Sequence, residues 1–129
     1  MYDLYSDPDS LALIQAFAGA KKPIAAVCHG PSVLLKATTP TGDALLSSAT
    51  ATGFSNTEEE QVGMTAVMPY LLEDELNRVT KGKYVKADQP WGEKVVVSQC
   101  AAPGVTLITG QNPTSAKGVA KEILNAVGL

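Results

Sequence analysis

The chain has 129 residues, of which 45% are hydrophobic and 18% charged, a composition typical of a single soluble globular domain. Its 13 acidic and 10 basic residues give a net charge of −3, and no cluster of Lys and Arg forms a phosphate-binding stripe, which argues against a nucleic-acid partner. No apolar run approaches the length that a membrane-spanning helix needs. The two cysteines, Cys28 and Cys100, do not form a disulfide scaffold, so we expect a reducing, cytoplasmic setting with free thiols.

The sequence predicts helices that alternate with short strands, with boundaries set by capping residues, apolar runs and Gly or Pro breaks. In the first half of the chain we expect a helix from Asp7-Pro8 to Gly19, a buried strand over 23–27, a short helix through Lys36 and a loop over 38–48. A short strand over 49–52, a helix capped by Asn56, a helix marked by Leu72 and Leu76 and a short strand over 84–86 follow. The chain then ends with two strands over 94–97 and 105–108 joined by a turn, and with a final helix opened by Asn112-Pro113.

This alternation predicts an α/β sandwich with a mainly parallel sheet. Residues 1–129 contain no internal repeat and no linker, so we expect one domain. In such folds the chemistry lies at the carboxyl ends of the strands, and Cys28 follows directly on the strand predicted over 23–27.

Cys28 is the candidate nucleophile. It lies on a sharp turn between a strand and a helix, where the side chain is pushed out of the backbone and the helix N-terminus supplies positive potential. Both effects favour the thiolate, the reactive form of cysteine, and the N–H of His29 becomes the natural oxyanion donor. The alternative is a buried structural cysteine, which is the commonest fate of a free thiol.

His29, the only histidine of the chain, is the candidate general acid and base, because its ordinary pKa suits proton transfer near neutrality. A histidine in this role usually needs an acid that holds its ring. Glu58, Glu59 and Glu60 follow Asn56, and on their own they are equally typical of a solvated acidic first turn of a helix.

The sequence predicts neither a metal site nor a cofactor. One histidine and two distant cysteines do not supply ligand-spaced clusters, and Gly-X-Gly-X-X-Gly does not occur.

Four collinear segments that cover nearly the whole chain resemble the ThiJ/PfpI superfamily, which has the class I glutamine amidotransferase-like fold. Residues 25–31 resemble its nucleophile elbow, 52–60 its second active-site segment, 69–74 the helix that follows, and 107–116 its last strand and the start of the C-terminal helix. The branch that these segments resemble contains glutathione-independent glyoxalases and heat-shock chaperone-like proteins.

The resemblance implies a flavodoxin-like three-layer sandwich and a cofactor-free glyoxalase that converts a small aldehyde, methylglyoxal, to D-lactate. Cys28 would be the nucleophile and His29 the acid and base, with Glu59, or else Glu58 or Glu60, as the partner of His29. Stress-response chaperone or holdase activity, and cysteine amidase or peptidase activity, are the alternatives within the superfamily.

One departure from the family pattern concerns the region before Met1. Family members carry an upstream segment with the first strands of the sheet, a glutamate near the nucleophile and a Gly-Gly-His-Gly turn. We therefore expect a fold that is incomplete at its N-terminus. The chain would then pair with a missing N-terminal half or would be an inactive truncated fragment. The resemblance also implies a homodimer as an alternative, because relatives tend to be dimers.

Overall fold

The computed structural model describes all 129 residues. Most of the expected elements are present, and their bounds follow the local signals in the sequence. The side chain of Asp7, for example, accepts a hydrogen bond from the N–H of Ser10 at the start of the first helix. The elements are α1 (Pro8–Gly19), β1 (Ile24–Val27), η1 (Gly30–Leu34), α2 (Asn56–Gln61), η2 (Thr65–Val67), α3 (Leu72–Val79), β2 (Val95–Gln99), β3 (Thr106–Gly110), η3 (Pro113–Ser115) and α4 (Ala116–Val127), where η marks a 3-10 helix.

The sheet has three strands in the order β1-β3-β2. Strands β1 and β3 are parallel, with Val27 opposite Gly110. Strands β2 and β3 are antiparallel, with Val97 opposite Ile108. The turn over 100–105 is too short for a crossover connection, and this forces the second pair to be antiparallel. The sheet is therefore mixed, and the expectation of a mainly parallel sheet holds only for β1 and β3.

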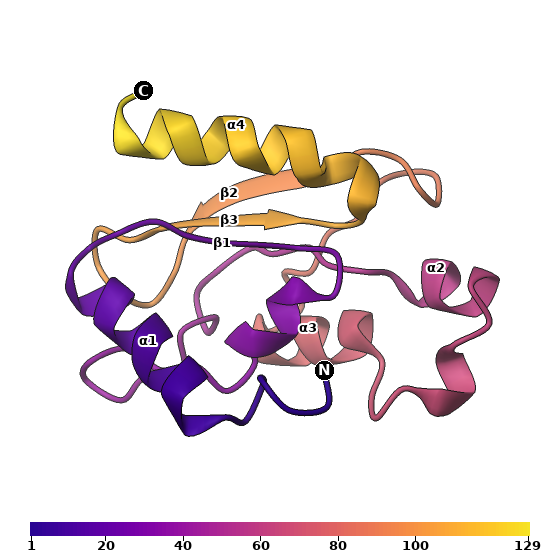
Figure 1. Cartoon of the computed structure of the whole chain (residues 1–129), viewed down its shortest axis with the longest axis horizontal. Helices are drawn as coiled ribbons and strands as arrows, with labels where there is room; N and C mark the ends of the chain where they lie inside the picture. The colour runs from indigo at the N-terminus through magenta and orange to yellow at the C-terminus, as the bar shows by residue number, and fades with distance from the viewer.

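Helices lie on both sides of this sheet (Figure 1). Helix α4 runs across one face, and α1, η1 and α3 lie on the other side. Gly110 allows α4 to approach closely, because a Cβ at this position would lie 2.6 Å from Val119 Cγ2 and 2.9 Å from Val27 Cγ2. The close contact between the helix and the sheet thus depends on a residue without a side chain.

The main hydrophobic core lies on the side of the sheet that faces α1 and α3. Leu107 of β3 belongs to the same buried cluster as leucines from η1, from α3 and from the loop over 38–48. The fully buried leucines are Leu34, Leu45, Leu46, Leu72, Leu76 and Leu107.

Three predicted elements differ in the structure. The strands expected over 49–52 and 84–86 reduce to one bridge between Ala51 and Tyr84. The N–H of Thr52 donates to the side chain of Thr109 in β3, so this backbone group does not form a strand ladder with β3. The helix expected through Lys36 is the 3-10 helix η1. Its bonds span three residues and continue to Ala37, where the chain turns into the loop.

We predict that Gly110→Ala destabilises the fold by about 1–3 kcal/mol, because the new methyl group has no room beneath α4. Chemical denaturation measures this change in the free energy of unfolding. Gly30→Ala is the matched control, since its Cβ would lie 3.5 Å from the Ala26 Cβ, an ordinary contact, and we expect a change within about 0.5 kcal/mol. Equal effects of the two substitutions would contradict the packing argument.

Candidate active site

Cys28 occupies the sharp turn that follows β1, with φ of 64°. Its N–H donates to the carbonyl of Gly110 at 2.9 Å, which completes the last residue pair of the parallel ladder, Val27 with Gly110. Its carbonyl accepts from the N–H of Phe54 at 3.0 Å. A positive φ is uncommon for a residue with a side chain, and here hydrogen bonds on both sides hold the conformation.

The structure brings Cys28, His29 and Glu59 together. The Sγ of Cys28 lies 3.6 Å from Nδ1 of His29, and Nε2 of His29 lies 2.6 Å from Oε2 of Glu59. The side chain of Glu59 is 4% exposed and that of His29 is 33% exposed. Because a carboxylate only accepts hydrogen bonds, Nε2 carries the proton in the neutral imidazole, and the lone pair of Nδ1 faces the sulfur.

The start of α2 distinguishes the three consecutive glutamates. The cap of α2 is Ser55 and not the expected Asn56, because Ser55 and Glu58 form a reciprocal capping box that fixes the first turn. Glu59 then faces His29, whereas Glu58 is buried in a different hydrogen-bond network and Glu60 is exposed. Glu59 is thus the acid that contacts the imidazole.

An aromatic pair packs beside the imidazole. The ring of Phe54 lies 4.3 Å from that of His29 between centroids, and Trp91 packs edge-on against Phe54 at 5.6 Å. The indole N–H of Trp91 donates to the side chain of Gln61. The contact of Phe54 with His29 was not predicted from the sequence. The available signal was an aromatic residue directly after Gly53 in the second active-site segment.

The surroundings of Cys28 favour the thiol and not the thiolate. Burial raises the pKa of the Cys28 thiol above its ordinary value of 9.0, and the negative charges of Glu58 and Glu59 raise it further, while a backbone hydrogen bond with His29 opposes these effects. The expectation of a stabilised thiolate is therefore wrong. The helix after the turn is a short 3-10 helix, and the charges that raise the pKa of the thiol are those of Glu58 and Glu59.

None of the three cavities of the chain is lined by Cys28, His29 or Glu59. The cavity between α1 and β1 has a volume of about 210 Å³, and five of its six lining residues are hydrophobic. These residues are Leu13, Ile14, Phe17, Pro23, Ile24 and Ala25. The candidate site is instead a partly exposed surface at the end of the sheet.

Other groups of the chain do not join this site. Cys100 is a free, buried cysteine after β2, and burial raises the pKa of its thiol. No three His, Cys, Asp or Glu side chains gather as metal ligands. None of the helices has the length and apolar character needed to traverse a bilayer.

The fold and the site define an α/β protein with a cysteine on a strand-to-helix elbow and a histidine–glutamate pair beside it. Over 110 residues the chain is 33% identical to hsp3103 of Schizosaccharomyces pombe, a probable glutathione-independent glyoxalase, and the match covers 81% of this chain and 40% of that protein. Over 107 residues it is 28% identical to glyoxalase 3 of Candida albicans, with coverage of 80% and 43%.

The structure also matches that of the Rapid Encystment Protein 24 kDa of Francisella tularensis, with a TM-score of 0.83 and 31% sequence identity, over 98% of this chain and 52% of that one. No protein-family model matches the chain. The chain belongs to the ThiJ/PfpI superfamily, in the branch that contains glutathione-independent glyoxalases. It spans less than half the length of the curated relatives described above.

We predict that the rate of Cys28 alkylation by iodoacetamide rises with pH, and that the midpoint of this pH profile lies above pH 9.0. The reason is that burial and the two carboxylates disfavour the thiolate. Peptide-resolved mass spectrometry measures the rate separately for Cys28 and Cys100. Glu59→Gln removes one negative charge and lowers the midpoint, and Glu60→Gln, an exposed position on the same helix, leaves it unchanged. A midpoint near neutrality in the unsubstituted protein would contradict the electrostatic argument.

Proposed function

We propose that this chain carries the nucleophile and the acid–base pair of a cofactor-free, glutathione-independent glyoxalase that converts methylglyoxal to D-lactate. The observation that carries the proposal is the chain of contacts from Cys28 Sγ through the imidazole of His29 to Glu59. The names of the curated relatives support the same reaction class.

In the first step, the sulfur of Cys28 adds to the aldehyde carbon of methylglyoxal. Because the pKa of the thiol is raised, the proton must leave as the carbon–sulfur bond forms, and Nδ1 of His29 accepts it. Glu59 stabilises the imidazolium that results. The backbone N–H of His29 donates a hydrogen bond to the developing alkoxide oxygen. The imidazolium then returns its proton to that oxygen, which gives the hemithioacetal and leaves His29 neutral for the second step.

In the second step, a proton moves from the former aldehyde carbon to the adjacent carbonyl carbon by way of an enediol, with His29 as the shuttle. The hemithioacetal becomes the thioester of lactate, and water then hydrolyses the thioester and restores the thiol. The net reaction is methylglyoxal plus water to lactate. One carbon is oxidised and its neighbour is reduced, so no external oxidant or reductant is required.

The proposal also concerns how the sheet continues beyond the three strands of this chain. We infer that the sheet is part of a flavodoxin-like three-layer sandwich and that it continues at the free edge of β1, which borders the apolar groove formed with α1. The strand that pairs there would come from a longer chain, a separate N-terminal polypeptide or a second copy of this one. A free thiol at Cys28 suits a reducing compartment such as the cytoplasm.

The exposed apolar side chains of α1 favour a second candidate, a holdase. Leu13 is 60% exposed and Phe17 is 43% exposed beside the edge of β1. Suppression of client aggregation that survives Cys28→Ala, and that is lost in Leu13→Ser combined with Phe17→Ser, would support it.

We predict that Cys28→Ala abolishes the formation of D-lactate from methylglyoxal without glutathione, and that His29→Ala and Glu59→Ala lower kcat by about 10²–10⁴-fold, because each removes part of the proton transfer. An enzymatic assay for D-lactate measures the rate. Cys100→Ala is the matched control and keeps the rate, since Cys100 lies outside the site. Turnover by Cys28→Ala at the original rate, or no turnover by the unsubstituted chain, would contradict the proposal.

A further inference from the structure

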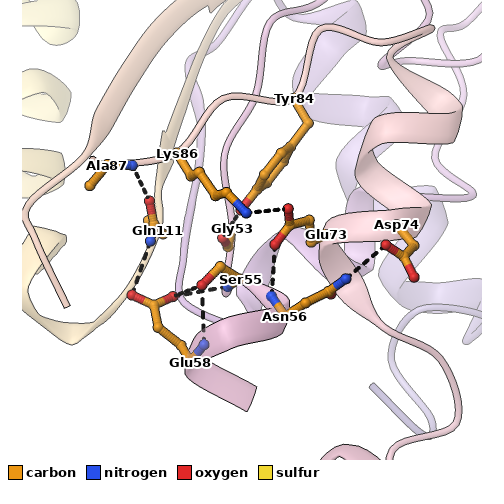
Figure 2. A network of polar contacts seen from close by, with 10 residues as sticks. All are labelled: Gly53, Ser55, Asn56, Glu58, Glu73, Asp74, Tyr84, Lys86, Ala87 and Gln111. Atoms are coloured by element: carbon orange, nitrogen blue, oxygen red, sulfur yellow. Dashed lines mark hydrogen bonds and ion pairs between the residues drawn. The ribbon is translucent and has the colours of Figure 1, made fainter. Parts of the chain in front are cut away.

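Glu58 is a buried charge that the proposed chemistry does not use. Its side chain is completely buried. One carboxylate oxygen accepts from the N–H and from the hydroxyl of Ser55, both at 2.9 Å. The other accepts from the N–H of Trp91 at 2.9 Å and from the side-chain amides of Gln111 at 3.0 Å and Asn112 at 2.8 Å. Figure 2 shows the part of this network that includes Ser55 and Gln111.

The donors around Glu58 keep it ionised. Burial by itself raises the pKa of the Glu58 carboxyl, but the hydrogen bonds from Ser55, Asn112 and Trp91 together hold it below its ordinary value of 4.5. No Lys, Arg or His forms an ion pair with Glu58. Its charge is therefore balanced by dipoles whose positions must match the carboxylate, which makes the geometry of the network specific.

The network joins segments that are far apart in the sequence. Ser55 caps α2, Trp91 lies in the loop before β2, and Gln111 and Asn112 follow β3 directly. Gln111 also accepts from the N–H of Ala87, so the carboxylate reaches a second point of that loop through it (Figure 2). One buried group thus joins α2 and the loop before β2 to the end of the sheet.

The rotation of α2 about its own axis decides where Glu59 points. Consecutive residues of a helix lie about 100° apart around the axis. With Glu58 held against the end of β3, Glu59 faces His29. Helix α2 spans only residues 56–61, and a helix this short has little stability of its own, so its orientation must come from side-chain anchors.

The same carboxylate also holds the aromatic pair. Trp91 has φ of 65°, and its N–H donates to Glu58. Its ring packs on Phe54, which in turn packs on the imidazole of His29. Glu58 is therefore connected to His29 by two routes, one through Glu59 and one through the aromatic side chains.

We propose that Glu58 is a positioning residue of the site: by anchoring α2 and Trp91 to the end of β3, its buried carboxylate aims Glu59 and the Phe54 ring at His29. This inference rests on the proposed function only for its kinetic test. The orientation of the His29 ring can be tested without turnover, because it determines which ring nitrogen carries the proton.

The test uses the single histidine and the single tryptophan of the chain as reporters. The nitrogen-15 chemical shifts of the His29 ring, taken from the alkaline plateau of a pH series, report which ring nitrogen carries the proton. We expect mostly the Nε2–H form in the unsubstituted protein, because Nε2 donates to Glu59. In folded Glu58→Ala we expect a mixture of the two forms, together with altered Trp91 fluorescence, and in Glu58→Gln an intermediate result.

Values of kcat and KM for the folded Glu58 variants distinguish a role in positioning from a role in stability alone. We expect Glu58→Ala to lower kcat by about 100-fold with little change in KM, as for a misplacement of catalytic groups by roughly 1 Å. Glu58→Gln, which keeps a planar acceptor, restores part of the rate. Glu60→Gln is the control on the same helix, and its tautomer, fluorescence and kcat match those of the unsubstituted protein.

Retention of the Nε2–H form and of the fluorescence in folded Glu58→Ala would overturn the proposal and leave Glu58 a purely structural residue. If Glu58→Ala does not fold, Glu58→Gln decides, and an unchanged tautomer there overturns the proposal as well. If the unsubstituted chain forms no lactate but the tautomer shifts in the Glu58 variants, the proposed function fails and the positioning role stands.

Discussion

Two backbone hydrogen bonds at Cys28 set the geometry on which the rest of the site depends. The N–H bonds to Gly110 of β3, and the carbonyl accepts from Phe54. Between them the residue has φ of 64°, a conformation that costs a residue with a side chain about 1–3 kcal/mol unless its surroundings hold it. The same two bonds join the end of the sheet to the segment that leads into α2, so the cysteine, the imidazole and the carboxylate meet at one point.

The approach of residues 53–54 to Cys28 depends on a glycine and changes the pKa of the thiol. A Cβ on Gly53 would lie 2.7 Å from a methyl group of Leu76, so residues 53–54 reach Cys28 only because Gly53 has no side chain. The approach also brings two glutamates near the thiol, and their charges add to burial in raising its pKa. A protonated thiol needs a base at the moment of attack, which is the role that the contact with His29 suits.

The sequence predicted the parts of the fold that have strong local signals, such as the cap at Asp7 and the helix opened by Asn112. The strands expected over 49–52 and 84–86 were not predictable, because short runs form a ladder only if a partner strand lies alongside. The resemblance indicated Glu59, but the choice among the glutamates depends on a capping box and on donors more than 50 residues away. The charge state of Cys28 depends on tertiary contacts that local patterns do not contain.

Hydrogen exchange at the amides of Cys28 and Phe54 tests the central claim most directly, because these are the donors of the two backbone bonds around the elbow. Both amides should exchange only through global unfolding, with the same protection as the amide of Ile108 in the central strand β3. Exchange of either amide at the rate of an open loop, while Ile108 remains protected, would contradict the account.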